Sequence, residues 1–309
     1  MTASEVSEPS LTSPPTTDWR VLLAAAFTVV AWASAFVVIR FVGHGVRPGA
    51  LSLGRLLVGS AVLSLLVLRS RRVRLTRREW ALVALIGVAW FGVYNVALNA
   101  GERHVDAGTA AMLIQVAPVL VGVMAGLLLG EGFPRMLVIG GLVAFAGTLI
   151  IGIATSTGQA DVSGVLLVLL SAVVYSVALV AQKVVLRRVS ALQVTWLACL
   201  IGTVACLPFA GTLVNDVAAQ PVGPILGIVY LGVVPTALAF STWAYALSRS
   251  SAGRLGITTF AVPPISILLG WLFLGEVPVL LAILGGIVSL VGVALTRRSV
   301  RVRTPVARA

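Results

Sequence analysis

Apolar segments long enough to cross a lipid bilayer recur along the whole chain. A bilayer core about 30 Å thick needs about 20 apolar residues in a helix, and the sequence predicts ten such segments with short connections. Their expected ranges are 21–43, 49–68, 80–100, 107–129, 135–153, 163–186, 192–213, 223–247, 254–275 and 278–296. Only helices and closed barrels satisfy their backbone hydrogen bonds in lipid. The predicted fold is therefore an all-α polytopic membrane protein with ten transmembrane helices.

The distribution of arginine predicts how these helices are oriented. The chain is 59% hydrophobic and 10% charged, with a net charge of +12. In a soluble protein that charge would suggest nucleic acid, but here the arginines gather in short connections, as the positive-inside rule describes. The sequence thus predicts the cell (inner) membrane, both termini in the cytoplasm and no nucleic acid partner. Residues 1–20 are expected to form a disordered cytoplasmic tail and 297–309 a basic one.

The two halves of the sequence repeat one another. A shift of 145 residues (276 minus 131) superposes Pro118 on Pro263 and Glu131 on Glu276 without a gap, together with several glycines. The repeated units are 21–153 and 163–296, each with five helices. Because five is odd, the second unit enters the membrane from the opposite side, which is the inverted repeat of many secondary transporters. Such repeats hold a central cavity near the membrane midplane.

Several motifs resemble those of the EamA family, which belongs to the drug/metabolite transporter (DMT) superfamily. They are AWASAFVVIR near the first span, LSLGRLL in the second, VAPVLVGVMAGLLLGE in the fourth and its repetition VPPISILLGWLFLGE. The resemblance covers nearly the whole chain. It implies ten helices around a central cavity and transport of small metabolites, often the efflux of amino acids.

Polar and aromatic residues within the spans are the candidates for the substrate cavity. Arg55 is either a cavity cation that meets a substrate carboxylate or an arginine that reaches the interface. Buried amides bind solutes or join helices, and aromatic residues near mid-span line a cavity or, near span ends, form an interfacial belt. The predicted cavity set is Trp32, Phe36, Arg55, Tyr94, Asn95, Asn99, Gln115, Tyr175 and Lys183. Trp243 is assigned to the belt, and Lys183 has interfacial anchoring as its alternative role.

Prolines and acids recur at matching places in the two units. Pro118 and Pro263 are interior to the fourth helix of each unit, so both helices are predicted to kink and to act as hinges. Glu131 and Glu276 follow the same helices at tight turns. Each is predicted to be a structural acid that caps the next helix, and Arg135 is a further predicted partner of Glu131.

The predicted function is a membrane transporter that exports or exchanges small metabolites, amino acids or related amphipathic solutes, by alternating access. The alternatives are a multidrug or lipid-linked substrate carrier, a non-transporting scaffold and a membrane-embedded enzyme. An enzyme is not expected, because the spans hold no paired carboxylates, histidine cluster or activated nucleophile. No cofactor or metal is expected, and the partners are a small-molecule solute and the bilayer, with the oligomeric state unspecified. None of the ten acids falls at mid-membrane, so facilitated diffusion or exchange fits as well as proton antiport.

Overall fold

The computed structural model describes most of the chain. It covers residues 18–43, 45–101, 103–104, 113–156, 161–275 and 277–296. Every regular element in these ranges is helical, and they contain no strand. The predicted all-α class is therefore confirmed for the described residues. Glu276, most of the predicted N-terminal tail and the whole C-terminal tail lie outside them.

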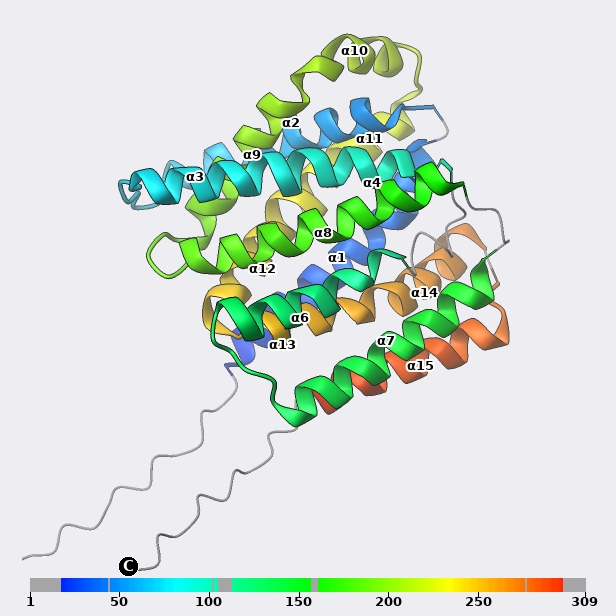
Figure 1. Cartoon of the computed structure of the whole chain (residues 1–309). Coiled ribbons are helices and arrows are strands. Elements are labelled where there is room, and N and C mark those ends of the chain that lie inside the picture. Colours follow the sequence, from blue (N-terminus) through cyan, green and yellow to red (C-terminus); the bar gives the residue numbers. More distant parts are fainter. Residues whose placement is uncertain are drawn as a thin grey trace, which may run out of the picture.

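Figure 1 shows the helices packed side by side in one bundle. The first half contains α1 (Trp19–Gly43), α2 (Pro48–Val67), α3 (Arg77–Ile86), the π-helical η1 (Gly87–Tyr94), α4 (Asn95–Gly101), α6 (Val116–Leu128) and α7 (Arg135–Thr155). The second half contains α8 (Val162–Val185), α9 (Ala191–Cys206), the 3₁₀ turn η2 (Leu207–Phe209), α10 (Ala210–Ala218), α11 (Val222–Leu231), the π-helical η3 (Gly232–Leu238), α12 (Ala239–Arg249), α13 (Ala252–Thr258), the 3₁₀ turn η4 (Thr259–Ala261), α14 (Val262–Leu274) and α15 (Leu280–Leu295).

Eight helical spans in the described chain are long and apolar enough to cross a membrane. They are Trp19–Gly43, Pro48–Val67, Arg77–Gly101, Arg135–Thr155, Val162–Val185, Ala191–Ala218, Val222–Arg249 and Ala252–Phe273. The shorter apolar helices Val116–Leu128 and Leu280–Leu295 lie within the other two predicted spans, so the predicted number of ten spans is not confirmed. The structure thus supports a multi-pass membrane protein.

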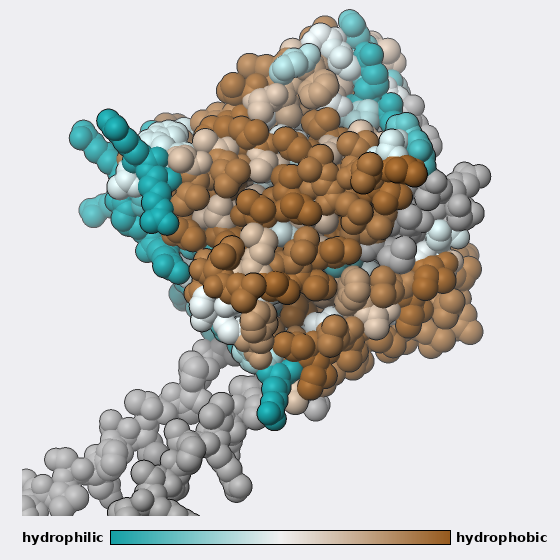
Figure 2. Space-filling model, viewed as in Figure 1, coloured by the Kyte–Doolittle hydropathy of each residue, from teal (hydrophilic) through white to brown (hydrophobic). Residues whose placement is uncertain are grey.

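The outer surface of the bundle is apolar. Large side chains such as Leu127 and Phe273 are 70% and 74% exposed, and Figure 2 shows brown, apolar residues across the middle of the face, with teal residues at its edges. A soluble protein rarely exposes a contiguous apolar surface of this extent. Lipid is the solvent that fits it.

Contacts between α7 and α15 reveal the relation between the two halves. A Cβ added at Gly140 would lie 2.7 Å from Gly292 O, and one added at Gly147 would lie 2.6 Å from Gly285 O. The 145-residue shift relates Gly140 to Gly285 and Gly147 to Gly292. It therefore exchanges the two contacts, Gly140–Gly292 and Gly147–Gly285. A two-fold interface has this property. The position numbers rise along one helix as they fall along the other, so α7 and α15 are antiparallel, as inverted repeats require.

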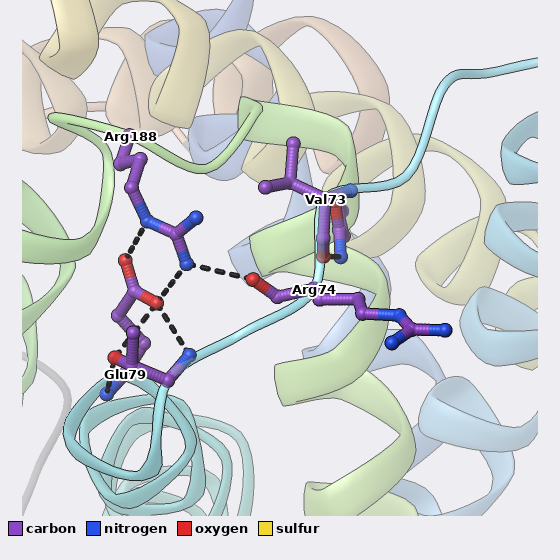
Figure 3. Close-up of polar contacts among 6 residues, drawn as sticks. Val73, Arg74, Glu79 and Arg188 are labelled. Atoms are coloured by element: carbon purple, nitrogen blue, oxygen red, sulfur yellow. Dashed lines mark hydrogen bonds and ion pairs between the residues drawn. The ribbon is translucent and has the colours of Figure 1, made fainter.

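One end of the bundle holds four neighbouring connections, 68–76, 129–134, 186–190 and 250–251. We call it the arginine-rich end. Arg188 donates hydrogen bonds to the carboxylate of Glu79 and, over 2.7 Å, to Arg74 O, as Figure 3 shows. Glu79 also completes a capping box with Thr76 at the start of α3. These bonds hold the connection 68–76 against the connection 186–190.

The opposite end of the bundle is joined by an ion pair between its own connections. Arg47, just before α2, donates to Asp216 of α10 through its backbone nitrogen at 2.8 Å and its guanidinium at 2.8 Å. Gln220 donates to Gly45 O at 3.2 Å. Helix α1 ends at this end of the bundle, and α11 begins there. The first helix of the chain therefore runs from the arginine-rich end to the opposite end.

Substitution of Gly147 by alanine is expected to destabilise the fold. The added Cβ would lie 2.3 Å from Ser289 N, so α15 must move, and overpacking of this kind costs about 1–3 kcal/mol. Gly122→Ala is the matched control, because nothing lies within 4 Å of its added Cβ. The measurement is thermal unfolding of the two variants in detergent. Equal melting temperatures would contradict the assigned contact.

Candidate functional site

A cavity of about 120 Å³ lies between the two repeats. It is lined by α1, α2, the η1–α4 segment, the start of α6, α8, α12 and the η4–α14 segment. On α1 its lining begins near mid-helix, at Trp32, and continues to Ile39. On the η1–α4 segment it runs from Trp90 to Asn99. The cavity therefore occupies the half of the bundle away from the arginine-rich end.

Eight of the nine predicted cavity residues line this cavity. They are Trp32, Phe36, Arg55, Tyr94, Asn95, Asn99, Gln115 and Tyr175. Among the other lining residues, Trp90, Phe240 and Thr259 are aromatic or polar and were not predicted. Trp90 and Phe240 are aromatic and near mid-span, the signal that selected Trp32 and Tyr175. Thr259 carries no comparable sequence signal.

An aromatic cluster closes the cavity toward the arginine-rich end. The ring centroids of Trp90 lie 4.9 Å from those of Tyr175 and Phe240, and Trp32 lies 4.9 Å from Trp243. The two pairs made by Trp90 are edge-to-face, a geometry that packs favourably at this distance. Trp243 has no exposed surface, so its assignment to the interfacial belt is wrong. Its position near a span end suggested lipid, but α12 turns the ring inward onto Trp32.

Arg55 is the one charged residue in the described lining of the cavity. It is 6% exposed, and its Nε donates to Thr236 Oγ1 at 3.0 Å. Thr236 in turn donates to Leu231 O at 2.7 Å. No ion pair between Arg55 and an acid occurs in the described chain, so its guanidinium keeps donors for a bound group.

Two π-helical segments lie at equivalent places in the repeats, with η1 in the cavity wall and η3 hydrogen-bonded to the lining residues Trp32 and Arg55. The 145-residue shift carries Gly87, the first residue of η1, onto Gly232, the first residue of η3. A π-helical segment frees backbone carbonyls from their usual partners, and such segments are frequent at functional sites. Here Pro235 O in η3 accepts a hydrogen bond from Trp32 Nε1 at 3.2 Å. Asn95 Nδ2 donates to two carbonyls of η1 in the same way.

The helices that carry Pro118 and Pro263 are interrupted beside the cavity. Helix α6 begins at Val116, after a break at Gln115, and α14 begins at Val262, after the 3₁₀ turn η4. Each proline lies in the first turn of the new helix, where a missing N–H costs little. The predicted kinks within continuous helices are therefore helix breaks. Gln115, Pro118, Thr259 and Val262 bring both breaks to the cavity wall.

Lys183 lies outside the cavity lining. Its Nζ donates to Leu247 O at 2.6 Å and to Ser250 O at 2.5 Å, at the C-terminus of α12. A cation there interacts favourably with the helix dipole. In this conformation Lys183 therefore anchors α8 to α12, and its predicted role with substrate stays a prediction.

Glu131 caps a helix, but not the one that follows it. Its carboxylate accepts hydrogen bonds from Ala252 N at 2.6 Å and Gly253 N at 3.0 Å, at the start of α13 in the other repeat. The next helix, α7, has Pro134 at its N-cap and no side-chain cap. The prediction that Glu131 caps α7 is thus wrong, because the fold brings the N-terminus of α13 closer to its carboxylate. The contact ties the two repeats together at the arginine-rich end.

Some buried polar atoms of the bundle have no hydrogen-bond partner within the described chain. They are Tyr175 Oη, Trp243 Nε1 and both amide atoms of Gln182. Tyr175 lines the cavity, whereas Gln182, seven residues along α8, lies toward the arginine-rich end and has no exposed surface. Unsatisfied buried polar groups are unfavourable. Tyr175 and Gln182, both on α8, are therefore buried at a cost in this conformation.

The fold and the cavity define a class of protein. Two repeated helical units, with discontinuous helices facing a cavity between them and a lipid-exposed surface, have the construction of a secondary transporter.

Comparisons with known proteins agree with this class. The model of the EamA-like transporter family matches residues 19–153 and 162–298. A "Probable terminal-alkyne amino-acid exporter" of Streptantibioticus cattleyicolor is 38% identical over 281 residues, covering 90% of this chain and 94% of that protein. The uncharacterized transporter YdfC of Bacillus subtilis is 29% identical, with 90% of each chain covered. The chain therefore belongs to the EamA-like transporter family.

A solved crystal structure shows the same fold. It matches with a TM-score of 0.72 and 21% identity, covering 90% of this chain and 96% of the other. The family assignment thus agrees with the sequence resemblance and with the architecture of the bundle.

Removal of the Glu131 carboxylate is expected to loosen the arginine-rich end. Losing a helix cap costs about 1–2 kcal/mol. The fraction of molecules in which this end of the bundle is open would then rise roughly 5–30-fold. The readout is thiol labelling of Gln182→Cys, above the background of the buried Cys199 and Cys206. Glu131→Ala should accelerate this labelling.

The matched control is Ser251→Ala. Ser251 caps the same helix, accepting from Arg254 N at 3.3 Å, but does not join the two repeats. Equal labelling rates in the Glu131→Ala and Ser251→Ala backgrounds would show that Glu131 does not hold the end closed.

Proposed function

We propose that this protein exports or exchanges small amphipathic metabolites that carry a carboxylate, with amino acids and their relatives as the favoured class. The observation that carries the proposal is Arg55, a single buried cation in a cavity whose other described lining is aromatic, aliphatic or neutral polar. A buried cation is costly unless it is paired. A solute carboxylate supplies that pair, and the aromatic rings accept the solute's apolar part.

The size of the cavity supports a small solute. Its volume of about 120 Å³ exceeds the roughly 10–15 Å³ that one water needs. It falls below the roughly 300–1,000 Å³ of pockets for drug-sized ligands. This favours a metabolite over the multidrug or lipid-linked substrates that an aromatic cavity would also suit. The name of the Streptantibioticus relative, an amino-acid exporter, points the same way.

The contacts that close the arginine-rich end, with the cavity in the other half of the bundle, support alternating access. Under the positive-inside rule the arginine-rich end faces the cytoplasm, with the protein in the cell membrane and both termini inside. The aromatic cluster, Glu131 and Lys183 then close the cytoplasmic side, and the cavity lies toward the outside. Export requires the converse state, in which the Glu131 contact with α13 breaks.

The charges around the cavity bear on what drives transport. None of its described lining residues is acidic, and proton-coupled transporters commonly use a carboxylate within the membrane. Exchange or facilitated diffusion therefore fits this site. Flux into liposomes that does not change with an imposed pH gradient is the corresponding expectation.

Arg55→Met is expected to lower the transport of apolar amino acids at least about tenfold, because a buried partner of the carboxylate is lost. The assay is exchange of a radiolabelled mixture of apolar amino acids in proteoliposomes that contain purified protein. Arg47→Met is the control, because Arg47 pairs with Asp216 outside the cavity. Unchanged exchange by a folded Arg55→Met variant would remove Arg55 from the site.

Pro118→Ala and Pro263→Ala are expected to impair transport more than expression, because alanine permits the interrupted helices to become continuous. The control is Pro208→Ala, since Pro208 lies in a 3₁₀ turn within a helical span and is exposed. Transport and membrane expression are measured side by side. Loss of both in equal measure would count against a hinge role for the two cavity prolines.

A further inference from the structure

Arg55 and Asn95 lie at the same depth on neighbouring helices. Asn99 Nδ2 donates to Ser52 Oγ at 3.2 Å, which fixes the register of α4 against α2. The two helices run in opposite directions across the bundle. One turn from this contact toward the arginine-rich end, α2 presents Arg55 and α4 presents Asn95. Both residues line the cavity.

The π-helical segment η1 sets which way the Asn95 amide points. Asn95 Nδ2 donates to Trp90 O and to Phe91 O, each at 3.0 Å. Only the amide nitrogen can donate hydrogen bonds to these two carbonyl oxygens, because an amide oxygen does not donate. Asn95 Oδ1 accepts no hydrogen bond in the described chain and is not among the enclosed atoms without a partner. It therefore offers the cavity an acceptor.

The other π-helical segment, η3, sets the position of Arg55 in the same manner. Thr236 uses its hydroxyl hydrogen on Leu231 O, so its oxygen is the acceptor for Arg55 Nε at 3.0 Å. The terminal nitrogens of the guanidinium have no partner in the described chain. They are donors with the fork geometry that suits a carboxylate. The equivalent segments of the two repeats thus orient a donor and an acceptor side by side.

We propose that the cavity binds its solute as a zwitterion, with the carboxylate on Arg55 and the ammonium group on Asn95 Oδ1. This rests on the proposed function and names its substrate class as α-amino acids rather than carboxylates in general. The described lining contains no acid that would attract a simple amine. The rings of Trp90, Tyr94 and Tyr175 surround the same region, and aromatic faces attract an ammonium group.

Binding of three matched solute sets to the purified protein in detergent tests the assignment, by calorimetry. The sets are apolar amino acids, their desamino acids, which lack the ammonium group, and their amino alcohols, which lack the carboxylate. Hydrogen bonds to a charged group are strong enough that the wild type should bind amino acids at least about tenfold more tightly than desamino acids. Asn95→Leu should bring this ratio close to one while desamino acids still bind.

The variant Thr236→Val distinguishes carboxylate binding by Arg55 from ammonium binding by Asn95. It removes the support of Arg55 but leaves Asn95 and η1 in place, so both acids should bind more weakly while the ratio between them is kept. Asn95→Ala repeats the Asn95 test in a smaller side chain, and gel filtration identifies variants that do not fold.

Two results would overturn the zwitterion assignment and leave the proposed function standing. One is a wild type that binds desamino acids as tightly as amino acids, and the other is an Asn95→Leu variant that keeps the wild-type ratio. A different result, desamino acids that bind equally to the wild type and Arg55→Met, would remove the carboxylate site and so the proposed function itself.

Discussion

The structure depends on the need to satisfy every backbone polar group away from water. Lipid offers no hydrogen bonds, so regular helices form the lipid-facing surface, and irregular backbone is tolerated only where protein or a cavity covers it. The described chain follows this rule at its centre. The π-helical segment η1 and the breaks before Val116 and Val262 line the cavity, and η3 is hydrogen-bonded to two residues that line it. The irregular backbone and the cavity are therefore parts of one feature.

The duplicated backbone carries different chemistry in its two copies. The segments η1 and η3 begin at residues related by the 145-residue shift, yet η1 holds Asn95 through its carbonyls and η3 holds Arg55 through Thr236. Close packing of α7 against α15 through glycines keeps the copies in two-fold register. In the proposed mode of binding, a symmetrical frame with unlike side chains offers the two ends of an amino acid different contacts.

Long-range contacts explain where prediction from sequence succeeded and failed for individual residues. Arg55, Asn95 and Tyr175 were recognisable because polar or aromatic groups within apolar spans are costly unless they face protein or a cavity. Trp243 and Glu131 were misassigned, because their surroundings come from segments more than 100 residues away: Trp32 for the former and the start of α13 for the latter. The residues next to Trp243 and Glu131 in the sequence give no indication of either contact.

The sequence by itself determined the solvent, the helical class, the duplication and eight of the residues that line the cavity. The first three follow from local hydrophobicity and from the spacing of prolines, glycines and acids, and the last from polar or aromatic side chains within apolar spans. The tertiary structure decided where the helices break, which end of the cavity is closed and which partner each polar group meets. These depend on how α2 lies against α4 and how α13 lies against the connection after α6. Such registers arise from the packing of whole helices, a property that no local stretch of sequence contains.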